Sequence, residues 1–352
     1  MPALYFIIGA TCTGKTALAL EWARANNAEI LCADAPLVYR GMEIGAAKPT
    51  KEQRSLAVHH GIDLVGVKEK FNVGDYAKYA KGIVEGLKPT PTPPPTDREG
   101  ENRQGSAPYP AAAQSKTSAD GVRAVGAEGV AGRSPVHNAS RNLLIVGGSG
   151  FYLKSFFEPA TDSLAISPQI AREVEAIFEK EKLEGLLKKL RAAGGRDLRG
   201  LDVQNPRRVM KALERSLASK KSYQELRAAF ENQPPPYLNY EKKVTMLSRR
   251  KEDLRARIEK RAQGMLDAGL IDEAAALDRE GLRENPAAAS VIGYRETLEF
   301  IDGKISREEL KERIVKDTME LVRKQTTFFK LLPVTKKIEL AEGKRPDAGG
   351  IF

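Results

Sequence analysis

The chain has 352 residues, a formal net charge of +10 at pH 7 and two cysteines, and charged residues make up 30% of it. This length allows two domains with a sizeable core, and no uninterrupted apolar run approaches the roughly 20 residues of a membrane span. Two cysteines argue against a disulfide framework and against a zinc site built from cysteine alone. The excess of positive charge favours a polyanionic partner such as nucleic acid. Because the sequence opens on a strand pattern and not on a basic and apolar leader, we expect a cytoplasmic protein without membrane contact.

The first motif along the chain is a phosphate-binding loop. The segment Gly9–Thr16 reads Gly-Ala-Thr-Cys-Thr-Gly-Lys-Thr, follows the apolar run Ala3–Ile8, and precedes the Ala- and Leu-rich segment Ala17–Ala25. A strand, a glycine-rich loop and a helix in this order predict a P-loop, whose backbone N–H groups and helix N-terminus bind phosphate. Lys15 adds a positive charge, and the Thr16 hydroxyl can help to hold a magnesium ion. The residues predicted to bind phosphate are Gly9, Thr11, Thr13, Gly14, Lys15 and Thr16.

Residues 1–155 are expected to form the first part of an α/β core, because strand and helix patterns alternate there. A second strand, Glu29–Ala33, stops at Asp34. A helix pattern covers Asn72–Leu87, and Asn142–Val146 is again a continuous apolar strand. This alternation predicts a parallel sheet flanked by helices.

The alternating pattern is interrupted between residues 89 and 140. A run of Thr and Pro gives way there to a tract rich in Gly, Ala and Ser, with hardly any aliphatic side chains. Such a composition cannot bury enough apolar surface to offset the entropy lost on ordering. We therefore expect a disordered, dispensable insertion.

The second half of the chain has mostly helical patterns. Residues 156–245 are expected to form a helical insertion domain, and residues 246–340 to return to the core as its C-terminal helical part. Within the latter part, helix patterns cover Lys251–Glu280 and Ser306–Leu331. Residues 341–352 are interpreted as a tail.

The ends of the apolar strands discriminate between the chemistries that a P-loop serves. Nucleotide kinases and NTPases usually carry an acidic residue at the end of a further apolar strand, where it orients magnesium. Here the strand that ends at Val146 continues into Gly147-Gly148, whereas the strand before Asp34 has the acidic end. This difference argues against the interpretation of the protein as a nucleotide kinase. It makes Asp34 the carboxylate of interest, either as a general base or, alternatively, as a helix cap or magnesium ligand.

Several segments, in order along the chain, resemble the tRNA dimethylallyltransferase family, also called tRNA isopentenyltransferase or IPP transferase. The resemblance runs from about residue 5 to 330 and leaves out the tract near 89–140. The segments are Gly9–Thr16, Ala33–Pro49, His59–Asp63, Val146–Lys154, Asn205–Val209, Gly293–Arg295 and Arg323–Phe329.

The resemblance implies a P-loop NTPase-like parallel sheet core with an inserted helical domain that grips the anticodon stem-loop. The family transfers a dimethylallyl group from dimethylallyl diphosphate to the exocyclic amine of the tRNA adenosine 3′-adjacent to the anticodon, with Mg²⁺ as cofactor. Lys15 is then implied to stabilise a leaving diphosphate, and Asp34 to act as the general base that accepts the amine proton. Ser149 is implied to offer a hydroxyl near the reacting centre, with a simple turn residue as the alternative. We expect the enzyme to be a monomer.

Basic residues at family positions imply contacts with tRNA, although each cluster alone is also typical of a solvated helix face. The positions implied to contact tRNA are Asp34, Ala35, Pro36, Leu37, Ser149, Arg207, Arg208, Arg295, Arg323, Lys324 and Gln325. Further candidates for contact with diphosphate or the RNA backbone are Arg40, Lys48, Arg249, Arg250, Arg257 and Arg261.

Some positions depart from the family pattern. Ala35 stands where the family usually has Ser, Met319 where it tends to have Arg, and Phe328 where Trp is usual. These departures affect the acceptor site more than the donor site. Two rival enzymes stay open: an isopentenyltransferase that acts on free adenine nucleotides, which the basic clusters disfavour, and a nucleotide kinase. A non-enzymatic RNA-binding protein would leave the P-loop and Asp34 without a purpose.

Overall fold

The structure is a computed structural model that describes residues 1–86, 141–160, 164–194, 197–341, 344 and 348–352. The insertion expected at residues 89–140 lies outside the described residues. Among the residues that are described, no helix combines the length and the apolar character needed to cross a membrane.

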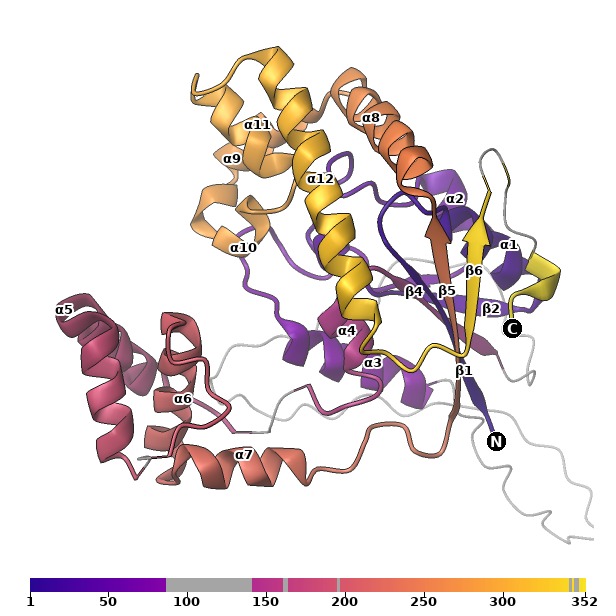
Figure 1. Cartoon of the computed structure of the whole chain (residues 1–352). Coiled ribbons are helices and arrows are strands. Elements are labelled where there is room, and N and C mark those ends of the chain that lie inside the picture. The colour runs from indigo at the N-terminus through magenta and orange to yellow at the C-terminus, as the bar shows by residue number, and fades with distance from the viewer. Residues whose placement is uncertain (87–140, 161–163, 195–196, 342–343, 345–347) are drawn as a thin grey trace, which may run out of the picture. The chain divides into compact units, whose positions relative to one another are not determined.

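The described residues form one six-stranded sheet in the order β3-β2-β4-β1-β5-β6, in which neighbouring strands run parallel (Figure 1). The strands are β1 Ala3–Gly9, β2 Ala28–Cys32, β3 His59–His60, β4 Asn142–Gly147, β5 Glu241–Arg249 and β6 Lys336–Leu340. The predicted α/β fold with a parallel sheet is therefore confirmed. Because the strands are parallel, the loops that follow β1, β2, β4 and β5 emerge at the same edge of the sheet.

Helices connect the strands and make up most of the C-terminal half. Their bounds are α1 Lys15–Ala25, α2 Lys51–Leu56, α3 Val73–Gly86, α4 Gly150–Lys154, α5 Pro168–Ala192, α6 Pro206–Ser219, α7 Tyr223–Glu231, α8 Lys251–Asp267, α9 Leu270–Arg279, α10 Pro286–Ala289, α11 Tyr294–Ile301 and α12 Arg307–Phe329. α12 packs along α8 and also contacts α11 (Figure 1). The single helix expected over Lys251–Glu280 is instead two helices, α8 and α9. They are separated at Gly269, whose φ of +96° does not continue a right-handed helix.

The side chains of β1 alternate between the two faces of the sheet and are buried on both. Phe6 and Ile8 belong to the hydrophobic cluster of one face, and Ile7 belongs to the cluster of the other face, together with Leu18 and Trp22 of α1. Burial on both faces explains why β1 reads as a continuous apolar run in the sequence.

The helical segment between α4 and β5 has a hydrophobic cluster of its own. α5 packs against α6 around Val174, Leu186 and Leu213, and α6 contacts α7. The core resumes before the boundary that was expected at residue 245, because Glu241–Arg249 forms β5 beside β1. The strand begins with a glutamate and two lysines, so its sequence does not have the apolar pattern that predicts a buried strand.

Residues 348–352, at the end of the segment that was interpreted as a tail, pack onto the core. Ile351 is buried, and its carbonyl oxygen accepts a hydrogen bond of 2.6 Å from the Thr245 hydroxyl. The ring centroid of Phe352 lies 5.0 Å from that of Tyr5 and 5.1 Å from that of Trp22. Two neighbouring apolar residues carry no periodicity, so the sequence pattern did not indicate this contact.

Candidate active site

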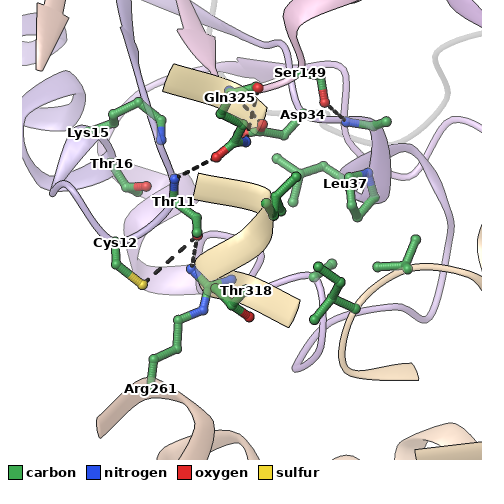
Figure 2. Close-up of a pocket in the computed structure, with 18 of the residues that line it drawn as sticks. Thr11, Cys12, Lys15, Thr16, Asp34, Leu37, Ser149, Arg261, Thr318 and Gln325 are labelled. Atoms are coloured by element: carbon green, nitrogen blue, oxygen red, sulfur yellow. Dashed lines mark hydrogen bonds between the residues drawn. The ribbon is translucent and has the colours of Figure 1, made fainter. Parts of the chain in front are cut away.

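A cavity of about 1130 Å³ opens at the edge of the sheet where β1, β2 and β4 end. Figure 2 shows side chains of the P-loop, of the loop after β2 and of α12 facing one another in it. The predicted site residues that line the cavity are Thr11, Gly14, Lys15, Thr16, Asp34, Ala35, Pro36, Leu37, Ser149, Arg295, Lys324 and Gln325. Residues predicted to bind the prenyl donor and residues predicted to bind the acceptor therefore line the same cavity.

The P-loop is closed by two hydrogen bonds to one carbonyl oxygen. The Thr13 hydroxyl donates to the Ala10 carbonyl over 2.8 Å, and Lys15 Nζ donates to the same oxygen over 2.9 Å. Gly14 has a φ of +102° and precedes the first turn of α1, so the loop leads directly into the helix N-terminus. Burial lowers the pKa of Lys15, and the nearby Asp34 carboxylate opposes this shift. A half-buried ammonium group beside a helix N-terminus is a site that an anion stabilises.

Gly9 ends β1 in close contact with β5. A Cβ atom at this position would lie 2.6 Å from the carbonyl oxygen of Leu247 and 3.1 Å from the hydroxyl oxygen of Thr13. The neighbouring strand therefore leaves no room for a side chain. Gly9 and the buried Thr13 are not among the residues that line the cavity, whereas the other predicted phosphate-binding residues line it.

Arginines from the end of β5 and from α8 hold the P-loop. The bonds run from Arg249 Nε to the Thr13 carbonyl (3.0 Å), from Arg257 Nε to the Cys12 carbonyl (2.8 Å) and from Arg261 Nη1 to the Thr11 hydroxyl (3.1 Å). Sequence reasoning left these residues among the open candidates. The spacing of Arg257 and Arg261 places them on one face of α8, which is the signal that favours them. Arg250 is exposed and is not among the residues that line the cavity.

Asp34 and Ser149 form a reciprocal pair of contacts between the ends of β2 and β4. Asp34 Oδ1 accepts a hydrogen bond of 2.6 Å from the Gly148 N–H, and Ser149 Oγ accepts one of 2.9 Å from the Ala35 N–H. Figure 2 shows both side chains at the cavity. Asp34 stands at the N-cap position of a short 3-10 helix, η1 (Ala35–Val38), but its side chain makes no capping hydrogen bond, so the geometry does not favour the alternative role as a helix cap.

Gln325 of α12 links the P-loop to the turn after β4. Its Oε1 atom accepts a hydrogen bond of 3.0 Å from the Thr11 N–H, and its Nε2 atom donates one of 3.0 Å to the Gly148 carbonyl (Figure 2). A Cβ atom at Gly148 would lie 2.5 Å from Gln325 Nε2, so glycine is needed for this approach. Gln325 was predicted to contact tRNA, and it lies between the residues predicted for the donor and those predicted for the acceptor.

The basic residues predicted near the C-terminus lie around the cavity. Arg295 lines it and pairs with Glu296 over 2.5 Å and with Asp317. Lys324 also lines it, while its neighbour Arg323 lies on a smaller adjoining depression. Each of these cations has a carboxylate partner, which an RNA phosphate would have to displace.

The other predicted basic residues lie elsewhere. Arg207 and Arg208 are exposed on α6 and do not line the cavity. Arg40 pairs with Glu69 on the surface. Lys48 is buried, where it donates to the Tyr39 carbonyl over 2.7 Å and forms ion pairs with Glu43 and Asp63, so it has a structural role.

Comparisons with known proteins agree on one family. The family model described as IPP transferase matches residues 37–92 and 131–331, and the one described as isopentenyl transferase matches residues 2–57. A tRNA dimethylallyltransferase of Opitutus terrae is 38% identical over 352 residues, which is 100% of this chain and 97% of the relative. A tRNA dimethylallyltransferase of a Sulfurovum species is 31% identical and covers 92% of this chain and 89% of its own length.

Solved structures of low sequence identity share the fold. A tRNA isopentenylpyrophosphate transferase from Bacillus halodurans superposes with a TM-score of 0.60 at 23% identity, covering 98% of this chain and 92% of that one. A eukaryotic dimethylallyltransferase, whose crystal structures show it acting on tRNA, superposes with a TM-score of 0.68 at 19% identity, covering 97% of this chain and 74% of that one. With the family matches and the full-length relative, the P-loop core and its cavity lead to one conclusion: the chain belongs to the IPP transferase family of tRNA dimethylallyltransferases.

Proposed function

We propose that the protein transfers the dimethylallyl group of dimethylallyl diphosphate to the exocyclic amine of the tRNA adenosine 3′-adjacent to the anticodon. Membership of the family makes the chain a prenyl transferase that modifies tRNA. The observation that carries the detailed reaction is the position of Asp34, which shares one cavity with the P-loop and is held there by Gly148.

The P-loop is assigned to the diphosphate of the donor. The carbon–oxygen bond breaks as the amine attacks, and negative charge grows on the departing diphosphate. Lys15 and the N–H groups at the start of α1 are placed to stabilise that charge, while Arg261 and Arg257 add positive charge around the loop. These groups are held before substrate arrives, so little reorganisation opposes the reaction.

Asp34 is assigned as the general base. The exocyclic amine of adenine is a poor nucleophile because its lone pair is conjugated with the ring, and it must lose a proton as it attacks. Among the described residues, only the Gly148 N–H donates to the Asp34 carboxylate, which leaves acceptor capacity for that proton. Ser149 binds the Ala35 N–H and so fixes the loop that carries Asp34, and its hydroxyl can still donate to the acceptor.

Mg²⁺ is the proposed cofactor, and enzymes of this family typically need a divalent metal. Among the described residues, no group of three or more His, Cys, Asp or Glu side chains could hold a metal ion. Mg²⁺ commonly takes one or two protein oxygens and completes its shell with substrate phosphates and water. The Thr16 hydroxyl at the cavity wall fits this pattern, and Mg²⁺ held there would neutralise diphosphate charge.

The proposed partners are the anticodon stem-loop of tRNA and dimethylallyl diphosphate. The basic residues around the cavity support a polyanionic acceptor, whereas a free adenine nucleotide would not need them. We further propose that the enzyme works as a monomer in the cytoplasm.

Transfer of a labelled prenyl group tests the proposal. The protein is incubated with labelled dimethylallyl diphosphate, Mg²⁺ and one acceptor, which is unmodified tRNA, AMP or ATP. We expect label in tRNA alone, at the adenosine next to the anticodon. Label in AMP or ATP but not in tRNA would assign the protein to the nucleotide-modifying enzymes, and no transfer to any acceptor would refute the prenyl transfer.

A further inference from the structure

An exposed apolar surface adjoins the candidate active site. Phe151, in the first turn of α4, is 65% exposed, and Leu331, just beyond α12, is also 65% exposed. The half-buried ring of Phe328 lies close to Phe151, with centroids 5.0 Å apart and ring planes at 67°. We name Phe151, Phe328 and Leu331 the aromatic rim.

The aromatic rim is continuous with the catalytic cavity. Phe151 and Phe328 line the main cavity together with Lys324. Phe328 and Lys324 also line the adjoining depression of about 410 Å³, whose other lining residues are Arg323, Thr327 and Leu331. A ligand that enters the cavity from this side therefore passes over the exposed ring of Phe151 and the half-buried ring of Phe328.

The local backbone is adapted to keep the rim in place. A Cβ atom at Gly150 would lie 2.6 Å from Phe328 Cγ, so glycine allows α4 to approach α12 this closely. The edge-to-face contact then fixes the Phe151 ring, although most of its surface stays in water. An exposed and oriented aromatic ring is costly to hydrate, which favours a ligand that covers it.

Two exposed cations flank the rim. The side chains of Arg323 and Lys324 are 76% and 69% exposed, and both lie near Glu320, at 3.9 Å and 2.9 Å. Exposed ion pairs of this kind are weak, so a phosphate group can displace the carboxylate. An exposed ring beside exposed cations is the combination that binds single-stranded nucleic acid, because bases stack on the ring and phosphates bind the charged groups.

We infer that the aromatic rim stacks an unpaired base next to the acceptor adenosine, with the backbone phosphate of that base on Arg323 and Lys324. This inference rests on the proposed function. An adenosine inside an RNA loop must leave its stack to reach Asp34, and its departure exposes the face of a neighbouring base. The rim covers that face at the mouth of the cavity.

The experiment uses the full chain and two anticodon stem-loop RNAs. In one RNA, 2-aminopurine replaces the base on the 5′ side of the acceptor adenosine, and in the other it replaces the base on the 3′ side. The fluorescence of 2-aminopurine reports stacking, and its titration gives the dissociation constant. In wild type we expect binding to change the fluorescence at one of the two positions. Phe151→Ala should lose that change and weaken RNA binding roughly tenfold, while Phe151→Tyr should retain both.

Matched controls separate stacking from other causes. Leu238 is 63% exposed and lines neither cavity, so Leu238→Ala removes an equally exposed apolar side chain and should leave RNA binding unchanged. The far-UV circular dichroism of Phe151→Ala should match that of wild type, which shows that the fold is intact. Arg323→Ala with Lys324→Ala should reduce the salt dependence of RNA binding by about one unit of slope or more.

Each outcome has a defined meaning. In one outcome, the wild type modifies tRNA, and Phe151→Ala binds RNA normally with an unchanged fluorescence signal. This outcome overturns the inference that the aromatic rim stacks a base, and it leaves the proposed function intact. A change in oligomeric state on Phe151→Ala, without a change in RNA binding, would identify the rim as a protein interface and also overturn the inference. Wild type that transfers no prenyl group to tRNA refutes the proposed function itself.

Discussion

Asp34 accepts a hydrogen bond of 2.6 Å from the backbone N–H of Gly148, a residue 114 positions away in the sequence. This bond holds the carboxylate at the cavity that the P-loop also lines. Asp34→Ala removes the proposed proton acceptor and keeps the P-loop. We therefore expect prenyl transfer in a single turnover to fall roughly 100-fold or more, with dimethylallyl diphosphate binding close to wild type.

Asp34→Asn is the matched control for this prediction. An asparagine oxygen can still accept from the Gly148 N–H, but the amide cannot take up the amine proton. A loss as large as that of Asp34→Ala is the expected result. An Asn variant with nearly full activity would mean that Asp34 only positions the loop.

Gln325 is expected to position the two loops that it joins. Gln325→Ala frees the Thr11 N–H and the Gly148 carbonyl, so the P-loop and the turn after β4, which holds the Asp34 carboxylate, lose their shared support. We expect the rate of transfer at saturating substrates to fall by roughly tenfold, because a small misplacement of reacting groups is costly. Steady-state kinetics with each substrate in turn checks this.

Gln325→Glu separates positioning from simple loss of packing. The glutamate can accept from the Thr11 N–H but cannot donate to the Gly148 carbonyl, and it brings a negative charge to the phosphate site. Its KM for dimethylallyl diphosphate should therefore rise more than that of Gln325→Ala. Two variants with identical kinetic parameters would contradict the bridging role.

Binding of dimethylallyl diphosphate should depend on the protonation of Lys15. Burial lowers the pKa of this ammonium group below the ordinary 10.5. Only the charged form attracts diphosphate, so affinity should fall as the pH rises through the lowered pKa, at a lower pH than for an exposed lysine. Because bound diphosphate favours the charged form, binding at alkaline pH should also take up a proton.

Calorimetry in buffers of different ionisation enthalpy measures this proton uptake. Lys15→Arg keeps its charge over the whole range and should show neither the uptake nor the alkaline loss of affinity. If wild type and Lys15→Arg follow the same pH dependence, another group is responsible for the titration.

Tyr294 is expected to stabilise the loop that follows η1 (Ala35–Val38), the short 3-10 helix after β2. Its hydroxyl donates to Glu273 Oε1 over 2.6 Å, and the Glu273 carboxylate accepts from the N–H groups of Ile44 and Gly45. Tyr294→Phe removes one hydrogen bond in a fully buried place, so the free energy of unfolding should fall by about 1 kcal/mol. Urea unfolding checks this. Glu273→Ala, which leaves the part-buried N–H groups of Ile44 and Gly45 without this acceptor, should be less stable than Tyr294→Phe.

The local signals of the sequence predicted the P-loop and Asp34, which the structure brings to one cavity. The P-loop and Asp34 are each marked by a few consecutive residues at the end of an apolar strand, and parallel strands bring such ends to one edge. The helices α3 and α12 were predictable for the same reason, since their apolar positions repeat within the helix itself.

The contacts that join these parts are not local, and the sequence could not supply them. Thr11 and Gln325 lie 314 positions apart, and no pattern along the chain relates a loop amide to one glutamine of a distant helix. β5 and β6 were not predicted because polar and charged residues occupy much of both strands. The burial of Lys48 was also unpredictable, since its carboxylate partners become neighbours only in the fold.

Gly9 has a consequence for how such sequences are interpreted across relatives. The carbonyl oxygen of Leu247 excludes any side chain at this position, and this exclusion does not depend on a bound phosphate. A descendant that had lost its catalytic activity would still keep glycine there as long as β5 stayed beside β1. The first glycine of the motif is thus a marker of strand pairing, and its presence in a distant homologue is no evidence of a working enzyme.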